Sequence, residues 1–430
     1  MTKKKYLIIA HGCQMNKSDS ERVAAILEKI GYKPAKNEVQ ADLVVLLACS
    51  VRQAAVDRLY GRARELNKIK KNNPAFKTIL TGCILPKDKK KFIGKFDLVL
   101  DLKQVIDLEK FKNYCQSWHE HYFKIEPRYS IKYSVFVPIM TGCNNFCSYC
   151  AVPYVRGREV SRDVADVLIE VKNLAKNGCL EIVLLGQNVN AYRPADIKNF
   201  SKKNPYKHPF AALLWEVNRI PGIERIFFTA PHPRDMTNDV IDALTLPKMV
   251  NYLHLPLQAG DDRILKKMNR SYTAADYLKL VKKIRKKKPD IALGTDIIVG
   301  FPGETKRAFQ NTIDFYKKAD FDIAYLAMYS PRQGTAAAKI KDDVPRAEKK
   351  RRWQTLQDLM EKIVFRKNQE YVGKVVSVLI NEFKNGKCIG NSREMKIVRF
   401  PGKKNMVGKI FEVKVNKAYE WILEGIISSF

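Results

Sequence analysis

The residues most able to do chemistry are three closely spaced cysteines, Cys143, Cys147 and Cys150, in the spacing C-x3-C-x2-C. A zinc site needs four ligands, but Cys179 lies too far along the chain to supply the fourth, and two nearby histidines come before the preceding apolar run. A 4Fe–4S cluster held by three cysteines instead leaves one iron open to a further ligand. The spacing therefore predicts such a cluster, and these three cysteines are its predicted metal ligands.

A second set of three cysteines is spread over the first hundred residues. Cys13, Cys49 and Cys83 each follow a short apolar run, at intervals close to the ~30 or more residues of one βαβ unit. The runs are residues 6–10, 43–47 and 78–80, and helical patterns cover 18–29 and 51–69. Ser18 or Asp19 is available as the N-cap of the first helix. Parallel strands end at one edge of a sheet, so we expect the three thiols to converge there and to hold a second 4Fe–4S cluster. The alternative is three unconnected core cysteines, which their regular placement disfavours.

The region around and after Cys150 alternates apolar strands with amphipathic helices. Counting the strand before Cys143, the pattern predicts six βα units, two fewer than in a full eight-unit barrel. In such a fold, functional residues lie at the carboxyl ends of the strands. The predicted strands are residues 134–139, 181–185, 225–228, 252–254, 292–299 and 323–326, and the helices are 163–175, 210–217, 235–244, 273–287 and 304–318.

From about residue 366 the pattern changes to short β runs with glycine turns. Four or five such strands predict a small antiparallel barrel, and barrels of this size often bind nucleic acid. The runs are residues 374–380, 394–400, 409–415 and 421–426. The segment from residue 366 to 430 carries 13 Lys and Arg against 6 Asp and Glu, and the whole chain of 430 residues has a formal net charge of +33. This excess predicts a polyanionic partner, and the basic run at residues 349–352 is a further candidate for contact with RNA.

The predicted fold class is therefore α/β, in three parts. An N-terminal parallel α/β domain (1–125) is followed by a partial (βα)6 barrel (129–360) and a C-terminal small antiparallel β-barrel (366–430). No apolar run approaches the ~20 residues of a membrane-spanning helix, and the apolar stretch behind the basic N-terminus is too short for a signal peptide. We therefore expect no membrane association and a place in the cytoplasm.

The C-x3-C-x2-C spacing, with Phe146 and Tyr149 beside its second and third cysteines, resembles the radical S-adenosylmethionine (radical SAM) superfamily. The chain as a whole resembles the methylthiotransferase family within it. It is most similar to the MiaB branch, which acts on isopentenyl-adenosine in the tRNA anticodon loop, and its last 65 residues resemble a TRAM domain. The family motifs are residues 12–16 (GCQMN), 18–22 (SDSER), 152–157 (VPYVRG), 161–162 (SR), 185–190 (LGQNVN), 254–256 (HLP), 300–305 (GFPGET) and 329–335 (YSPRQGT).

The resemblance implies two clusters with different roles. The cluster on Cys143, Cys147 and Cys150 would bind SAM through its open iron and, with an electron from a donor such as flavodoxin or ferredoxin, cleave it to a 5′-deoxyadenosyl radical. That radical would take hydrogen from C2 of adenosine 37, a position that no general base in the sequence could deprotonate. The cluster on the other three cysteines would present the sulfur, methylated by a second SAM. The TRAM-like barrel would hold the tRNA backbone by charge.

The predicted SAM pocket consists of polar or glycine residues that follow the barrel strands and two aromatic residues of the cysteine loop. Each residue also has a simpler explanation, such as a glycine for a tight turn or a histidine satisfied in the core. The segment 300–303 is not a phosphate-binding loop, because it lacks the Lys-Ser/Thr that such a loop needs. The predicted pocket residues are Phe146, Tyr149, Gly186, Gln187, Asn188, His254, Gln258, Gly300 and Tyr329.

Two alternatives remain at the level of sequence. The same chemistry could act on threonylcarbamoyl-adenosine in tRNA or on a ribosomal-protein aspartate, although residues 14–16 (QMN) differ from those branches. The protein could also be a non-catalytic iron–sulfur protein that binds RNA. The chain departs from the usual family residues at Leu47, Ala48, Pro231 and Ala259, none of which is a predicted ligand. The remaining cysteines, Cys115, Cys179 and Cys388, are interpreted as structural.

Overall fold

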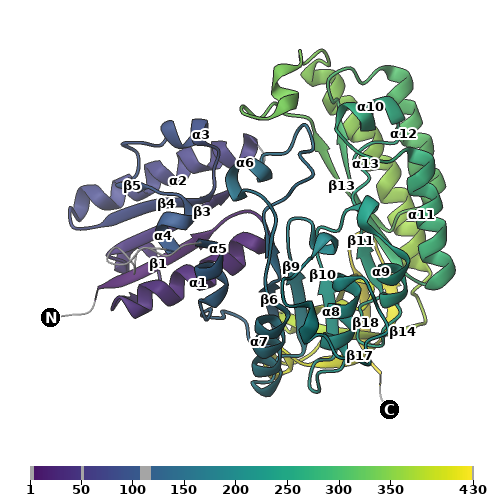
Figure 1. Cartoon of the computed structure of the whole chain (residues 1–430), viewed down its shortest axis with the longest axis horizontal. Coiled ribbons are helices and arrows are strands. Elements are labelled where there is room, and N and C mark those ends of the chain that lie inside the picture. Colours follow the sequence, from purple (N-terminus) through teal and green to yellow (C-terminus); the bar gives the residue numbers. More distant parts are fainter. Residues whose placement is uncertain (1–3, 50–52, 107–117, 429–430) are drawn as a thin grey trace.

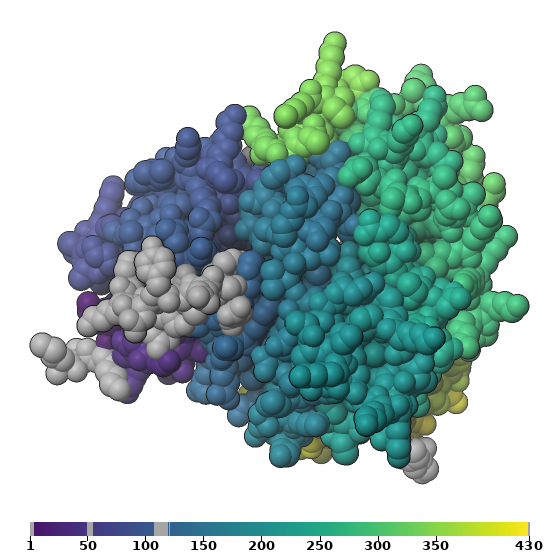
Figure 2. Space-filling model, in the orientation of Figure 1, coloured from purple at the N-terminus to yellow at the C-terminus, as the bar shows by residue number. Residues whose placement is uncertain are grey.

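The computed structural model describes residues 4–49, 53–106 and 118–428. The chain forms an N-terminal parallel sheet, a central open barrel and a C-terminal closed barrel (Figure 1). On the face shown in Figure 2, the N-terminal part in purple and blue abuts the central part in teal, and the C-terminal barrel in yellow shows only along one edge. Two positions with sequence-based predictions, Cys115 and the start of the helix expected at 51–69, lie outside the described residues.

The N-terminal sheet is parallel throughout and has helices on both faces. Its core strands are apolar on both sides, which explains the nearly unbroken hydrophobic runs at these positions. In spatial order the strands are β2 (Lys33–Pro34), β1 (Lys5–Ala10), β3 (Leu43–Cys49), β4 (Lys77–Cys83) and β5 (Leu98–Val99). One face is covered by α1 (Gln14–Lys29), α4 (Leu102–Ile106) and α5 (Trp118–Lys124), and the other by α2 (Gln53–Asn72), while α3 (Pro86–Lys90) follows β4.

Helix α1 begins at Gln14, one turn earlier than predicted. Cys13 occupies the N-cap position, and Ser18 and Asp19 are fully buried inside the helix instead of capping it. Their polar atoms are satisfied by other partners, because Ser18 accepts a hydrogen bond from Arg22 and Asp19 accepts one from Tyr122. The N-cap prediction was therefore wrong, since the burial of Asp19 depends on a partner that lies elsewhere in the fold.

All six strands predicted for the central part are present, and they run parallel to one another. They form two three-stranded sheets, in the orders β10-β9-β6 and β11-β12-β13, which an isolated bridge between Ile226 and Met249 connects. Strands β6 and β13 end the two rows, and among the described residues neither has a further strand beside it, so the barrel is open on that side. The strands are β6 (Ser134–Pro138), β9 (Glu181–Leu185), β10 (Arg225–Phe228), β11 (Tyr252–His254), β12 (Ala292–Val299) and β13 (Ile323–Met328).

Helices cover the outer surface of this barrel and share a large apolar core with its strands. The longest helix, α13 (Arg346–Gln369), packs on β13 and leads into the C-terminal barrel. The other helices are α7 (Val164–Lys176), α8 (Pro209–Asn218), α9 (Asn238–Ala243), α10 (Asp262–Lys267), α11 (Ala274–Lys287) and α12 (Lys306–Ala319). The segment after β6 contains α6 (Val152–Arg156) and a small hairpin of β7 (Met140–Thr141) and β8 (Val160–Ser161).

The C-terminal barrel is closed and filled by apolar side chains such as Val378, Phe400 and Leu423. Its strands, in the order of pairing, are β14 (Val375–Lys384), β15 (Lys387–Ser392), β16 (Ile397–Pro401), β18 (Leu423–Ile427) and β17 (Ile410–Ala418). The pairs are antiparallel as predicted, except for β16 and β18, which pair in parallel. In the described part of the chain, no helix combines the length and apolar character needed to cross a membrane.

The C-terminal barrel docks on the amino-terminal ends of the central strands. These ends lie opposite the carboxyl ends, where the cysteine loop and the predicted pocket are found. Its exposed lysines therefore lie on a surface separate from the central barrel's functional end. The contacts join Tyr133 to Asn381, Arg225 to Ser392, Asn251 to Arg393 and Asp322 to Lys396.

Candidate active site

Cys13, Cys49 and Cys83 lie together at the carboxyl edge of the N-terminal sheet. Cys49 and Cys83 end neighbouring strands and are paired directly in register, and Cys13 begins α1 after β1. Gly12 has a φ of +116°, and a Cβ there would lie 2.6 Å from Cys49 Cβ, so only glycine lets the chain pass so close. Burial raises the pKa of the Cys83 thiol to about 12, and the neighbouring Cys13 and Cys49 thiols act in the same direction.

A buried polar network lies beside Cys83, whereas Cys13 is exposed and Cys49 is half-buried. Asn16 donates from Nδ2 to the carbonyl groups of His11 and Ala48, and its Oδ1 lies 3.6 Å from Cys83 Sγ. Arg156, from the central part of the chain, donates from Nε to Cys83 Sγ over 3.0 Å and forms an ion pair with Asp19. The contact with Ala48 uses its backbone, so the departure from the usual family side chain leaves it intact.

Cys143, Cys147 and Cys150 lie in the loop that follows β6 and β7. Phe146 adopts a left-handed backbone conformation, with a φ of +46°, which turns the loop between the first two cysteines. Cys143 and Cys147 are buried, and burial raises the pKa of Cys143 to about 11 and that of Cys150 to about 12. The Cys143 and Cys150 thiols are therefore protonated at neutral pH unless a metal displaces their protons.

Each of the last two thiols has a hydrogen-bond donor beside it. The backbone N–H of Val152 lies 3.4 Å from Cys150 Sγ, and Arg270 Nη1 lies 3.4 Å from Cys147 Sγ. Arg270 is itself buried and also donates to Tyr272 and to the carbonyl of Pro256. Donors that point at cysteine sulfur suit an iron–sulfur cluster, whose potential depends on such bonds.

The two groups of cysteines suit iron–sulfur clusters better than they suit single metal ions. Within the ranges that the structure describes, no three His, Cys, Asp or Glu side chains are placed to share one metal ion. In a 4Fe–4S cluster each cysteine binds a different iron, so its thiols must stand apart. Two groups of three thiols, both with N–H donors at sulfur, are compatible with that chemistry.

Helix α6 connects the two cysteine groups. It begins two residues after Cys150, at Val152, and ends at Arg156, whose guanidinium contacts Cys83. Figure 1 shows α6 at the boundary between the N-terminal sheet and the central strands. The two sites therefore lie next to each other, although they come from different parts of the chain.

Gln187 and Asn188 follow β9 and face the cysteine loop. Gln187 Oε1 accepts the backbone N–H of Gly142, the residue before Cys143. Asn188 is buried and donates from Nδ2 to Glu159 and Asp235, while its Oδ1 is buried and has no hydrogen-bond partner among the described residues. An unpaired buried amide oxygen is costly unless a ligand satisfies it, so Asn188 suits a ligand with a donor group.

Tyr329, which directly follows β13, is a second pocket residue with a buried polar atom suited to a ligand. Its ring packs against Phe301 with centroids 5.1 Å apart, and its buried hydroxyl has no partner in the described part of the structure. His254, by contrast, is already engaged, because Nε2 lies 3.1 Å from Asp296 and its ring packs against Tyr325.

The remaining predicted pocket residues have local structural roles. A Cβ at Gly186 would lie 2.6 Å from Met140 Cγ, and one at Gly300, where φ is +69°, would lie 2.3 Å from Lys349 Cγ. Gln258 also has a left-handed backbone, with a φ of +77°, and bridges to β12 through its main chain. These three residues shape the strand ends through their backbone.

The two aromatic residues of the loop face different surroundings. Phe146 lies under the guanidinium of Arg158, 4.4 Å from its ring centroid, and beside Tyr154. Tyr149 packs toward the apolar cluster that contains Ala259, a position where burial favours alanine over a hydroxyl-bearing residue. Cys179 and Cys388, interpreted as structural, are both fully buried in apolar clusters.

The structure corrects a further interpretation of the sequence and adds contacts that the sequence did not reveal. The basic run at 349–352 is not a uniform RNA contact, because Lys349 and Arg352 are buried and paired with Asp342 and Glu304. Sequence reasoning also missed the side chains that contact the thiols. Asn16, Asp19 and Arg156 lie within family motifs, so charged or amide residues beside a cysteine motif were the available signal, whereas Arg270 lies outside the motifs.

Three family models match the chain in succession. They are described as "Uncharacterized protein family UPF0004" over residues 5–101, "Radical SAM superfamily" over residues 137–316 and "TRAM domain" over residues 369–427. Among solved structures, the chain is similar to the radical SAM methyltransferase TsrM from Kitasatospora setae, with a TM-score of 0.54 and 13% identity over 79% of this chain and 77% of that one. At this identity the similarity shows the fold alone.

Curated relatives match almost from end to end. The chain is 40% identical to the tRNA-2-methylthio-N(6)-dimethylallyladenosine synthase of Carboxydothermus hydrogenoformans, over 99% of this chain and all of the relative. It is 42% identical to the synthase of the same name from Acetivibrio thermocellus, over 99% of this chain and 91% of the relative. The chain therefore belongs to the family of tRNA-2-methylthio-N(6)-dimethylallyladenosine synthases, the MiaB-type radical SAM methylthiotransferases.

Proposed function

We propose that the two cysteine groups divide between them the reaction of this family. The chain is a radical SAM tRNA methylthiotransferase that converts N6-isopentenyladenosine at position 37 to its 2-methylthio derivative. In our proposal, Cys143, Cys147 and Cys150 hold the cluster that binds SAM, and Cys13, Cys49 and Cys83 hold the cluster that carries the sulfur. When bound, these clusters and SAM supply the radical that removes the C2 hydrogen and the methylthio group that replaces it.

The observation that carries this proposal is the contact between the two sites through α6. A sulfur donor and a radical source must both reach one carbon of the substrate, so their sites must lie next to each other. Arg156, six residues after Cys150, contacts Cys83 directly. Buried arginines at both sites, Arg156 and Arg270, orient cysteine sulfur and exclude water from it.

The other residues of the site hold the ligand in position. Asn188 Oδ1 and the Tyr329 hydroxyl, both buried and unpaired in the described structure, are suited to bind polar groups of SAM. Gly186, Gln258 and Gly300 shape the strand ends on which SAM would rest. Functionally the chain divides into residues 1–125, which would supply the sulfur, 129–360, which would generate the radical, and 366–430, which would bind the RNA.

The partners follow from charge and chemistry. The C-terminal barrel exposes lysines on its outer surface, which would contact tRNA phosphates without reading sequence. The anticodon loop is the part of the tRNA that would enter the central barrel, since single-stranded bases can be splayed out. A reducing protein such as flavodoxin or ferredoxin would supply the electron, in the cytoplasm where tRNA is found. The exposed lysines are Lys374, Lys384, Lys387, Lys403, Lys404, Lys409, Lys414 and Lys417.

The test is nucleoside mass spectrometry on tRNA incubated anaerobically with the reconstituted protein, SAM and dithionite. Isopentenylated tRNA should gain a methylthio group, and the same tRNA without the isopentenyl group serves as the control. If 5′-deoxyadenosine forms but the isopentenylated tRNA stays unmodified, and a threonylcarbamoylated tRNA or a ribosomal protein is modified instead, the proposed substrate is wrong. Absence of 5′-deoxyadenosine would contradict the radical chemistry itself.

A further inference from the structure

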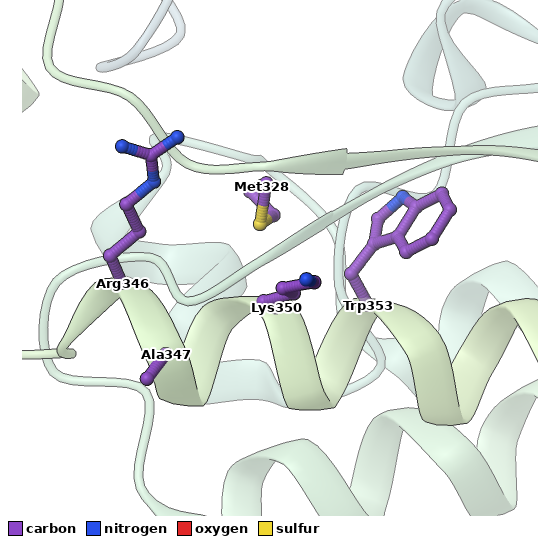
Figure 3. Close-up of a pocket in the computed structure, with 5 residues that line it drawn as sticks. All are labelled: Met328, Arg346, Ala347, Lys350 and Trp353. Atoms are coloured by element: carbon purple, nitrogen blue, oxygen red, sulfur yellow. The ribbon is translucent and has the colours of Figure 1, made fainter.

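A groove of about 560 Å³ lies between the end of β13 and the start of α13 (Figure 3). The established family and the cysteine sites do not account for it. Three of its lining residues, Arg346, Lys350 and Trp353, are spaced four and three positions apart on α13 and so share one helix face. Figure 3 shows their side chains along this face, next to Met328 of β13. The groove is lined by Met328, Arg346, Ala347, Lys350 and Trp353.

The cations of this groove differ from the other cations of the same helix segment. Lys349 pairs with Asp342, and Arg351 and Arg352 both pair with Glu348. Arg346 and Lys350, in contrast, form no ion pair with any residue that the structure describes. The two cations that face the groove are therefore the two left free to bind an external anion.

The rest of the groove is apolar and partly exposed. Met328 is 41% exposed, which is unusual for a methionine at the end of a barrel strand. The indole N–H of Trp353 donates to the carbonyl of Leu326 over 3.2 Å, which fixes the ring and leaves its surface to line the groove. A fixed aromatic ring beside two cations matches how proteins bind a nucleotide, with the base or ribose on the ring and the phosphate on the cations.

The groove also lies at the functional end of the barrel. Met328 is the last residue of β13, the strand at the open side, and the next residue is Tyr329 of the predicted pocket. Lys349, one residue before Lys350, places its ammonium group 5.1 Å from the Tyr329 ring centroid. A polyanion that enters the barrel from its open side would pass this groove.

We propose that this groove binds a nucleotide of the tRNA next to the modified loop, with its phosphate between Arg346 and Lys350 and its base or ribose against Met328 and Trp353. This inference rests on the proposed function, which identifies the polyanion as tRNA. The start of α13 adds the favourable dipole of a 24-residue helix to the two cations. The apolar ring beside the cations favours RNA over an acidic protein surface.

The experiment compares two double variants of the full chain. Arg346→Gln with Lys350→Gln removes the two groove cations, and Lys318→Gln with Lys362→Gln removes two lysines elsewhere on α12 and α13 as a control of equal charge. Binding of isopentenylated tRNA is measured at several salt concentrations. The groove variant should bind tRNA about tenfold more weakly at ~0.1 M salt. The slope of the logarithm of the tRNA binding constant against the logarithm of the salt concentration should fall in magnitude by about two, because about one phosphate contact is lost per cation. The control variant should keep both values.

Two further measurements separate the outcomes. Cleavage of SAM with dithionite should be unchanged in the groove variant, because that reaction needs no tRNA contact. Equal effects of the two double variants on tRNA binding would overturn the proposal. Unchanged tRNA binding, with slower reduction by flavodoxin, would also overturn it and assign the groove to a protein. If the groove variant alone loses tRNA binding but the unmodified chain forms no methylthio product, the proposed function fails and the groove assignment stands.

Discussion

Arg156 donates a hydrogen bond to the sulfur of Cys83 over 3.0 Å, although the two residues lie 73 positions apart. The same guanidinium forms a buried ion pair with Asp19, which in turn accepts a hydrogen bond from Tyr122. Arg156 ends the helix that follows Cys150, so this short helix links the two cysteine sites. One part of the interface between the N-terminal and central parts of the chain is thus built from polar contacts beside Cys83.

Replacing Arg156 by glutamine should destabilise the chain and alter the N-terminal site. It leaves Asp19 as an unpaired buried charge, which costs about 3–5 kcal/mol of the free energy of unfolding. It also removes a donor from Cys83 sulfur, so the reduction potential of the cluster held there should fall. Potentiometric titration followed by electron paramagnetic resonance measures the potential. Arg156→Lys keeps the charge beside Asp19 and should recover most of the stability. An unchanged potential in Arg156→Gln would show that this hydrogen bond has no part in setting the potential.

Alanine variants of the two cysteine groups should lose different steps of the reaction. Cys143→Ala should abolish both 5′-deoxyadenosine and the methylthio product, whereas Cys13→Ala should keep cleavage of SAM and lose the product. Each variant should lose about four irons per chain after reconstitution, since one cluster is removed. Liquid chromatography with mass spectrometry follows both products, and iron analysis follows the clusters. Full product formation by Cys13→Ala would show that the division between the sites is wrong.

The strands were predictable because their signals are local. Short apolar runs at a regular interval identified β3, β4 and all six central strands, and a strand buried on both faces needs no partner to be recognised. The thiol contacts of Arg156 and Arg270 could not be predicted, because their partners lie far away in the sequence. The sequence likewise suggests Lys349 as a candidate RNA contact, because the run 349–352 does not itself reveal that Asp342 and the Tyr329 ring enclose this side chain.

Gly12→Ala should lower stability and iron binding at the N-terminal cysteine site by more than backbone strain at a positive φ explains. An added Cβ would meet Cys49 Cβ at 2.6 Å, so one of the predicted ligands must move. Gly31→Ala is the matched control, because its φ is +98° but a Cβ there meets nothing within 4 Å. The control should lose only about 1–2 kcal/mol of stability and keep its iron. Gly12→Ala should lose more, together with about four irons. Chemical denaturation and iron analysis measure both, and equal behaviour of the two variants would contradict the close approach.

Asp88→Asn should weaken the contact between the N-terminal and central parts. Asp88 and Arg332 form a buried ion pair across this boundary, and removing one partner of such a pair costs about 3–5 kcal/mol. Asp101→Asn breaks an exposed pair with Lys89 in the same part of the chain and should cost at most about 1 kcal/mol. Thermal unfolding measures the difference. Similar melting temperatures for the two variants would mean that Arg332 gains no stability from Asp88.

His232 should make the stability of the protein depend on pH. It follows β10, its ring is buried against Tyr272, and burial together with the nearby Arg270 lowers its pKa to about 3. The unfolded chain, in which histidine has a pKa of about 6.5, therefore binds a proton that the native chain does not bind. The difference in pKa therefore stabilises the folded chain above pH ~6.5. This stabilisation is lost as the pH falls, by about 2 kcal/mol at pH ~5. Urea denaturation between these pH values should show a smaller loss in His232→Gln, which carries no titrating ring. An equal loss in both proteins would show that the folded His232 ring binds a proton as readily as the unfolded one.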